Sequence, residues 1–408
     1  MIGHRLRIAT VALLAGIVEA GPAFGEAPTG KESPADVRGK LQISADDLRP
    51  HVEYLASPKL EGRGTSRGKQ LAREYIAGIF RELRLAPLFG ETEFLQEIPG
   101  PTGKQGERTL LGKNIGAWLP GSDPALRDEC VILSAHYDHL GVANGAVYPG
   151  ADDNAGSVAM MLEVARRFAG PGPKPRRSLL FLSCDLEEKM LLGSRWFVAH
   201  PPRPLEQVRL FITAEMIGRT LGDLPMKTIF VLGGEHAEGL KAVVNSVAVP
   251  PELEVAHLGI DLIGTRSDYG PFRSEKVPFL FFSGGEHPDY HTPRDTADRV
   301  DYERIACVSN LIAGVCRNVA DAEATPAWTD KPSHALDEVR TLHRITDLVL
   351  KTDDAAQAAG RPHLSQLQRF TVTNVHAKTA QIIERGQVQP DERPWLVRSA
   401  QFLLLTVF

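Results

Sequence analysis

The sequence predicts an α/β fold in which a mixed, mostly parallel sheet is covered by helices on both faces. Short, uniformly apolar runs recur along the chain, among them CVILSA at 130–135 and SLLFLSC at 178–184. Segments in which apolar residues have helical spacing, such as 156–168, separate these runs. Strands that are apolar on both sides are typical of a sheet buried between two layers of helices.

The individual elements can be assigned in chain order. Residues 48–58 and 67–85 are predicted to be helices, because their apolar residues recur every three or four positions. Residues 94–98 and 114–119 are predicted to be short strands. Further along the chain, the predicted strands are 130–135, 178–184, 209–214, 228–234 and 278–285, and the predicted helices are 156–168, 193–199, 238–247 and 302–322.

The chain divides into three parts. Residues 1–25 contain two arginines, then an apolar stretch, then the small-x-small sequence AFG. This pattern is typical of a secretory signal peptide, and its apolar stretch is too short to cross a bilayer. Residues 26–328 hold the α/β pattern, and 329–408 repeat leucine, valine and isoleucine at helical spacing, which predicts a C-terminal helical extension. We therefore expect a secreted or periplasmic protein without a membrane span.

Charge and cysteine content exclude several classes of function. The chain has 46 Lys and Arg against 51 Asp and Glu, a net charge of −5. It has no basic cluster, which argues against nucleic acid and anionic membranes as partners. Four cysteines in 408 residues are too few for a disulfide framework, so we expect four buried free thiols.

Polar residues follow the apolar segments at the points where each one ends. These residues are His136, Tyr137, Asp138 and His139, then Asp152 and Asp153, then Glu187 and Glu188, then Glu215, and finally His291. In parallel sheets, ligands bind just beyond the carboxyl ends of the strands. Imidazole and carboxylate groups suit zinc, and two adjacent glutamates allow one to bind metal while the other acts as a base. The sequence therefore predicts a metal site with a general base at this edge.

The same segments resemble a known family. AHYDHLG, YPGADDNAGSVAMMLEVAR, LEE followed by LLGS, AEMIG and YHTPRDT resemble the co-catalytic di-zinc aminopeptidases of metallopeptidase family twenty-eight, in order and in spacing. This family includes secreted leucine aminopeptidases and the ectodomain of glutamate carboxypeptidase. The resemblance runs from about His51 to about Val319. Two positions depart from the family pattern: Glu215 stands where Asp is usual, and Met190 stands where Gly is usual.

The resemblance implies the zinc exopeptidase fold, two zinc ions per chain and peptide substrates. It also implies a role for each residue: His136 and Glu215 bind one zinc, Glu188 and His291 bind the other, Asp153 bridges them, Glu187 is general base and then acid, and Tyr290 donates to the oxyanion. Asp138 would orient His136, and the peptide bond after Asp153 would be cis. The implied function is that of a secreted zinc-dependent aminopeptidase, which cleaves N-terminal peptide bonds through a hydroxide that bridges the zincs.

Three other functions stay open. Amidohydrolase-like deacylases and carboxypeptidases share the H-x-D and Glu-Glu patterns, but they insert a domain soon after the glutamates, where this chain has no room. A glutaminyl cyclase of related fold would need one zinc, and a peptidase-like binding protein would need none. The sequence GTSRG at 64–68 matches a nucleophile elbow, but no strand is predicted before it. No motif marks the side-chain specificity, the choice between aminopeptidase, dipeptidase and carboxypeptidase action, or the role of residues 329–408.

Overall fold

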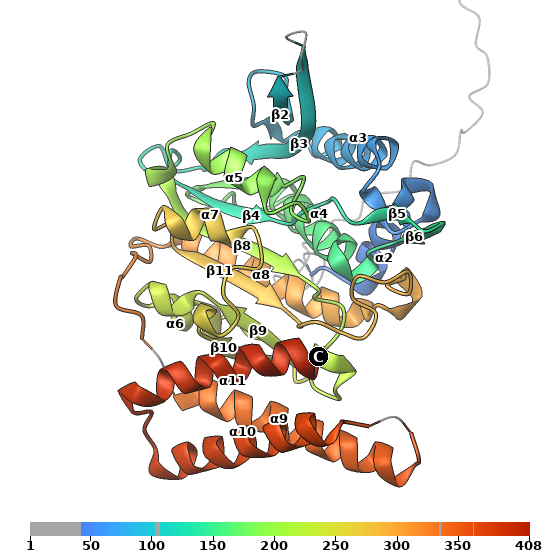
Figure 1. The fold of residues 1–408 in the computed structure, drawn as a ribbon. Helices are drawn as coiled ribbons and strands as arrows, with labels where there is room; N and C mark the ends of the chain where they lie inside the picture. Colours follow the sequence, from blue (N-terminus) through green and yellow to red (C-terminus); the bar gives the residue numbers. More distant parts are fainter. Residues whose placement is uncertain (1–41, 103–106, 334–335, 362) are drawn as a thin grey trace, which may run out of the picture. The chain divides into compact units, whose positions relative to one another are not determined.

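A mixed sheet lies at the centre of the structure, a computed structural model that describes residues 42–102, 107–333, 336–361 and 363–408 (Figure 1). The predicted signal peptide, residues 1–25, lies outside the described residues. The nine strands of this sheet are β1 (Ala86–Pro87), β2 (Leu95–Thr102), β3 (Arg108–Leu119), β4 (Cys130–Ser134), β7 (Ser178–Ser183), β8 (Val208–Glu215), β9 (Thr228–Leu232), β10 (Glu254–Leu258) and β11 (Phe279–Ser283).

The four central strands are parallel, and this decides where polar loops meet. They lie in the order β7-β4-β8-β11, and each pair among them is parallel. The strands β3 and β9 flank this group and run antiparallel to β7 and β11. Because the central strands point the same way, the loops that follow them leave from one edge of the sheet. A two-stranded hairpin of β5 (Gly141–Ala143) and β6 (Ala146–Tyr148) follows β4.

Two hydrophobic cores cover the two faces of the sheet. Alternate residues of β4 enter different cores: Val131 and Leu133 pack in the first, and Ile132 packs in the second. The helices of the first core are α2 (Ala45–Leu55), α3 (Ser66–Glu82), α4 (Gly156–Ala169), α6 (Leu240–Asn245) and α8 (Tyr302–Asp321). The helices of the second are α5 (Leu192–Ala199), α7 (Tyr269–Ser274), α9 (Leu336–Ala358), α10 (Gln366–Arg385) and α11 (Arg393–Thr406). The prediction of an α/β fold with a sheet covered on both faces is confirmed.

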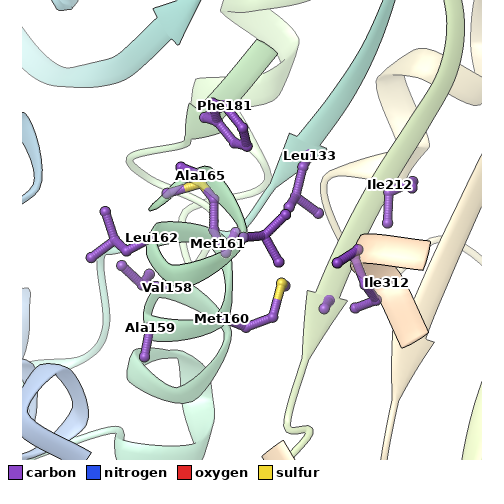
Figure 2. Packing of buried hydrophobic residues seen from close by; sticks show 14 of the residues in the cluster. Leu133, Val158, Ala159, Met160, Met161, Leu162, Ala165, Phe181, Ile212 and Ile312 are labelled. Carbon is purple, nitrogen blue, oxygen red and sulfur yellow. The ribbon is translucent and has the colours of Figure 1, made fainter. Parts of the chain in front are cut away.

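Helix α4 occupies the middle of the first core. Figure 2 shows Met161 among the side chains that lie between α4 and the sheet, near Leu133 of β4 and Phe181 of β7. All three are at most 1% exposed. Burying one side chain of this size contributes about 1.5–3 kcal/mol. This packing holds the start of α4, and the aspartates before it, against the carboxyl edge of the sheet.

The structure adds elements that the sequence patterns missed. Strand β10 lies at the edge of the sheet, so Glu254 in it is exposed and its pattern is not uniformly apolar. Helix α11 starts with Pro394 in its first turn, a position that favours proline. The cysteines are free, as predicted, but Cys307 is only half-buried while the other three are buried. Ser66 of GTSRG begins helix α3 directly after a short 3-10 helix rather than a strand.

None of the helices in the described part of the chain combines the length and the apolarity that crossing a bilayer requires.

Candidate metal centre

The predicted site residues converge at the carboxyl edge of the parallel strands. His136 follows the end of β4, Glu187 and Glu188 follow β7, and Glu215 is the last residue of β8. Asp153 lies in a short helical turn, Ala151–Ala155, which leads into α4. His291 is in the loop after β11. The structure therefore brings together side chains that are up to 155 residues apart in the sequence.

One group of donor atoms surrounds His136. Its Nε2 lies 3.4 Å from Oδ1 of Asp153 and 3.6 Å from Oε1 of Glu215. Donor atoms bound at about 2.0–2.1 Å to a tetrahedral zinc lie about 3.3 Å from one another. Both distances from Nε2 of His136 thus match the separation of two donor atoms on one zinc ion. The extra methylene of Glu215, compared with aspartate, does not carry its carboxylate away from His136.

A second group surrounds His291. Its Nε2 lies 3.2 Å from Oδ2 of Asp153 and 3.2 Å from Oε2 of Glu188. This nitrogen is buried and has no hydrogen-bond partner in the described structure, which fits an atom whose partner is a metal ion. The two groups share Asp153, and each group faces a different oxygen of its carboxylate. Two metal ions on either side of Asp153 therefore fit the residues present.

His139 belongs to the second group as well. Its Nδ1 lies 2.8 Å from Oε1 of Glu188, and the ring is 3% exposed. The ring also packs against the backbone at Gly150, where a side chain would lie only 2.5 Å from its Cδ2 atom. Sequence reasoning assigned no role to His139, although it follows His136 in the same motif. The sequence feature that could have indicated a role for His139 is its position at the carboxyl end of the same strand.

Glu187 lies next to the donor atoms around His136. Its Oε2 is 4.0 Å from Nε2 of His136, while its backbone N–H donates to Oδ1 of Asp138 at 3.0 Å. Burial and the neighbouring Glu215 carboxylate raise the pKa of Glu187 well above its usual range. A carboxyl group with a raised pKa can hold a proton as well as accept one, which suits an acid and base.

Tyr290 stands beside the second group. Its ring stacks on the imidazole of His291, with ring centres 3.8 Å apart. Burial and then the nearby carboxylates of Asp153 and Glu215 raise the pKa of its hydroxyl. The hydroxyl thus keeps its proton at neutral pH and can serve as a hydrogen-bond donor.

Asp138 contacts His136, as the sequence suggested, but through its backbone carbonyl rather than its carboxylate. Nδ1 of His136 lies 3.1 Å from the carbonyl oxygen of Asp138 and 3.9 Å from its carboxylate. The carbonyl is therefore the group that orients the imidazole. The carboxylate instead accepts from the backbone of Glu187 and so ties the loop after β4 to the loop after β7.

Arg63 holds the backbone beneath the site. It is fully buried, and burial lowers the pKa of its guanidinium to about 10. Its nitrogens donate to five carbonyl oxygens: those of Tyr137 at 2.8 Å, Leu55 at 2.7 Å, Pro149 at 2.6 Å, Gly150 at 2.7 Å and Asp153 at 3.4 Å. Sequence reasoning missed this residue, because nothing in LEGRG indicates what its arginine contacts.

Backbone conformations near the site are unusual. The peptide bond between Asp153 and Asn154 is cis, as the resemblance implied. Left-handed φ angles occur at Leu186 (59°), Met216 (51°) and His291 (55°), each a predicted site residue or the direct neighbour of one. Residues other than glycine adopt this region rarely and at a cost, and such positions cluster at functional sites.

Comparisons of the sequence with known proteins identify peptidases as relatives. Residues 114–316 match the model of peptidase family M28. Aminopeptidase YwaD of Bacillus subtilis is 26% identical over 219 residues, which are 51% of this chain and 45% of that protein. The chain spans less than half the length of the first curated relatives that it matches.

Solved structures share the fold. That of BSAP, a zinc aminopeptidase from Bacillus subtilis, superimposes with a TM-score of 0.54 at 16% identity and covers 71% of this chain and 99% of its own. That of Porphyromonas gingivalis glutaminyl cyclase gives 0.52 at 18% identity and covers 67% and 98%. At these sequence identities, the two structures support similarity of the fold alone. Through its domain at residues 114–316, the chain belongs to peptidase family M28.

Proposed function

We propose that this protein is an exported, zinc-dependent aminopeptidase that holds two zinc ions per chain. The observation that carries the proposal is the pair of donor groups on either side of Asp153, with neighbouring atoms 3.2–3.6 Å apart. Membership of peptidase family M28 and similarity to a protein named as an aminopeptidase support it. Export follows from the signal-like sequence of residues 1–25.

Five side chains would hold the metal ions. His136 and Glu215 would bind one zinc, Glu188 and His291 the other, and Asp153 both. Bound zinc supplies a Lewis acid for the scissile carbonyl and lowers the pKa of water toward about 7.

Glu187 and Tyr290 would carry out the remaining chemistry. Glu187 takes a proton from the attacking water and then delivers it to the leaving amine, as general base and general acid. The hydroxyl of Tyr290 donates a hydrogen bond to the carbonyl oxygen as negative charge develops there. A well-placed donor of this kind is worth roughly 3 kcal/mol in the transition state.

The cations near the site favour an aminopeptidase over a carboxypeptidase. A carboxypeptidase needs a positive group for the terminal carboxylate of its substrate. Arg266 lines the same cavity as Glu215 and Tyr290 but is paired with Glu286. Arg63 is buried under backbone carbonyls and does not face a substrate.

Glutaminyl cyclase activity is the second candidate, because a solved cyclase shares the fold. A single zinc would serve that reaction. Two donor groups, rather than one, favour the peptidase.

The number of metal ions and the product of the reaction test these alternatives. Zinc is counted in the purified protein, and hydrolysis of aminoacyl amides is measured with free and with acetylated amino termini. We expect two zincs, cleavage of the free forms, loss of activity after chelation, and recovery with Zn²⁺ or Co²⁺. One zinc together with ring closure of glutaminyl peptides would identify a cyclase. Full activity of metal-free protein would refute the proposal.

A further inference from the structure

An apolar cavity opens beside the candidate metal centre. Glu215 and Tyr290 both line it, so one end of the cavity adjoins the residues proposed to act on the scissile bond. The cavity contains about 890 Å³ of empty space, including the part open to solvent. Small-molecule sites typically combine mainly apolar walls with a few polar groups. The cavity has this composition.

Two C-terminal helices form part of its wall. Strands contribute Phe230 of β9 and Phe281 of β11, while helices contribute Leu342 of α9 and both Ala400 and Leu403 of α11. Helices α9 and α11 lie outside residues 114–316, which match the peptidase family. This part of the wall therefore comes from outside the segment that matches the family.

A network of ion pairs holds the two helices in place. Arg393, at the start of α11, donates to Glu338 of α9 at 2.6 Å and to Asp261 at 2.9 Å. Asp261 directly precedes Leu262 and Ile263, which also line the cavity. Glu338 is 1% exposed, and a buried carboxylate is costly to separate from its charge partner. The helices are thus fixed to the loop that forms the adjacent wall.

We propose that helices α9 and α11 build the pocket for the substrate side chain, and that the protein therefore prefers a large apolar residue at the scissile carbonyl. This inference rests on the proposed peptidase function. Tyr290 is the proposed donor to the carbonyl oxygen and also lines the cavity. In the residue that bears this carbonyl, the Cβ atom is only two bonds from the carbonyl carbon. Its side chain therefore enters the cavity that Tyr290 lines.

A series of amides tests the preference. Alanyl, leucyl and phenylalanyl amides with one chromogenic leaving group are compared by kcat/KM. Each methylene that enters an apolar pocket is worth roughly fourfold, so leucyl should exceed alanyl by on the order of 50-fold. Equal kcat/KM for the three amides would overturn the proposal.

Variants of α11 test the wall itself. Ala400→Phe fills the cavity and should lower the leucyl-to-alanyl ratio at least about tenfold. Leu403→Ala enlarges it and should raise the phenylalanyl-to-leucyl ratio, and this variant needs no extra room in order to fold. Leu405→Ala is the matched control, because Leu405 is on the same helix but is 74% exposed. Unchanged ratios in both pocket variants, with thermal unfolding showing that they are folded, would refute the role of α11.

Binding measurements separate this inference from the proposed function. The affinities of leucinamide and alaninamide are measured by calorimetry in the zinc-loaded protein and in Ala400→Phe. Selective loss of leucinamide binding supports the pocket even if no amide is hydrolysed, in which case the peptidase proposal alone fails. If the amides are hydrolysed but Ala400→Phe loses affinity for leucinamide and alaninamide equally, the proposed pocket is refuted. The peptidase proposal then stands.

Discussion

Nδ1 of His139 lies 2.8 Å from Oε1 of Glu188, while Oε2 of the same carboxylate lies 3.2 Å from Nε2 of His291. One oxygen of Glu188 thus faces His139, and the other faces His291. A hydrogen bond from a buried imidazole to a carboxylate ligand orients that ligand for its metal. His139 is in the right place to do this for Glu188.

His139→Ala should therefore weaken metal binding. Loss of such an orienting partner typically costs about 10–100-fold in metal affinity, and we expect the effect on one of the two zincs. Competition with a chromophoric chelator measures both affinities. His200→Ala is the control, because His200 is exposed and stacks on Trp196. Equal affinities in His139→Ala and wild type would show that His139 is not an orienting residue.

Arg63→Met should destabilise the whole protein. Five carbonyl oxygens would lose a charged donor inside the core, and we expect a loss of roughly 3–5 kcal/mol in the free energy of unfolding. Urea denaturation measures it. Arg67→Met removes an arginine whose side chain is 72% exposed and should change stability by less than about 1 kcal/mol. A similar small effect for Arg63→Met would contradict the conclusion that Arg63 holds the backbone beneath the site.

Glu187→Gln should lower kcat by about 10²–10⁴-fold without releasing metal. The amide keeps the shape of the side chain but cannot accept the proton from water. Steady-state kinetics and a zinc count are made on the same preparation. Glu206→Gln, at an exposed position, should match wild type. Activity of Glu187→Gln within a few-fold of wild type would exclude Glu187 as the base.

Glu215→Ala should reduce zinc binding from two ions to one at micromolar concentrations. Glu215 is one of the donors around His136, and Ser267 donates to its Oε1. In wild type we expect this group to lose its metal first on dilution. Metal titration of both proteins decides the question, and Glu187→Gln serves as the control because it should keep two zincs. Identical titrations for Glu215→Ala and wild type would mean that another residue supplies the donor.

Met190→Gly should stabilise the protein by about 1 kcal/mol. Met190 has a φ of 64°, a left-handed conformation that glycine adopts without strain, and its side chain is 77% exposed. Lys189→Gly is the matched control: Lys189 is exposed with an ordinary φ and should lose about 0.5–1 kcal/mol. Thermal unfolding of both variants measures the change in stability. If Met190→Gly is less stable than wild type, the left-handed backbone at Met190 is not strained.

The sequence by itself determined the α/β class and the grouping of the metal-site candidates. Apolar runs such as 130–135 and 178–184 are local patterns, and they persist because both faces of each central strand are buried. Since parallel strands end at one edge, the position of His136 or Glu188 after its run already predicts that they meet.

Only the tertiary structure decided what surrounds these residues. The contact of Arg63 with Gly150, that of His139 with Glu188 and the cavity wall at Ala400 all join segments that are far apart in the chain. No local spacing encodes such contacts, because each depends on how two separate elements pack against the sheet. The same holds for Met190, whose left-handed φ is imposed by the loop around it rather than by its own preference.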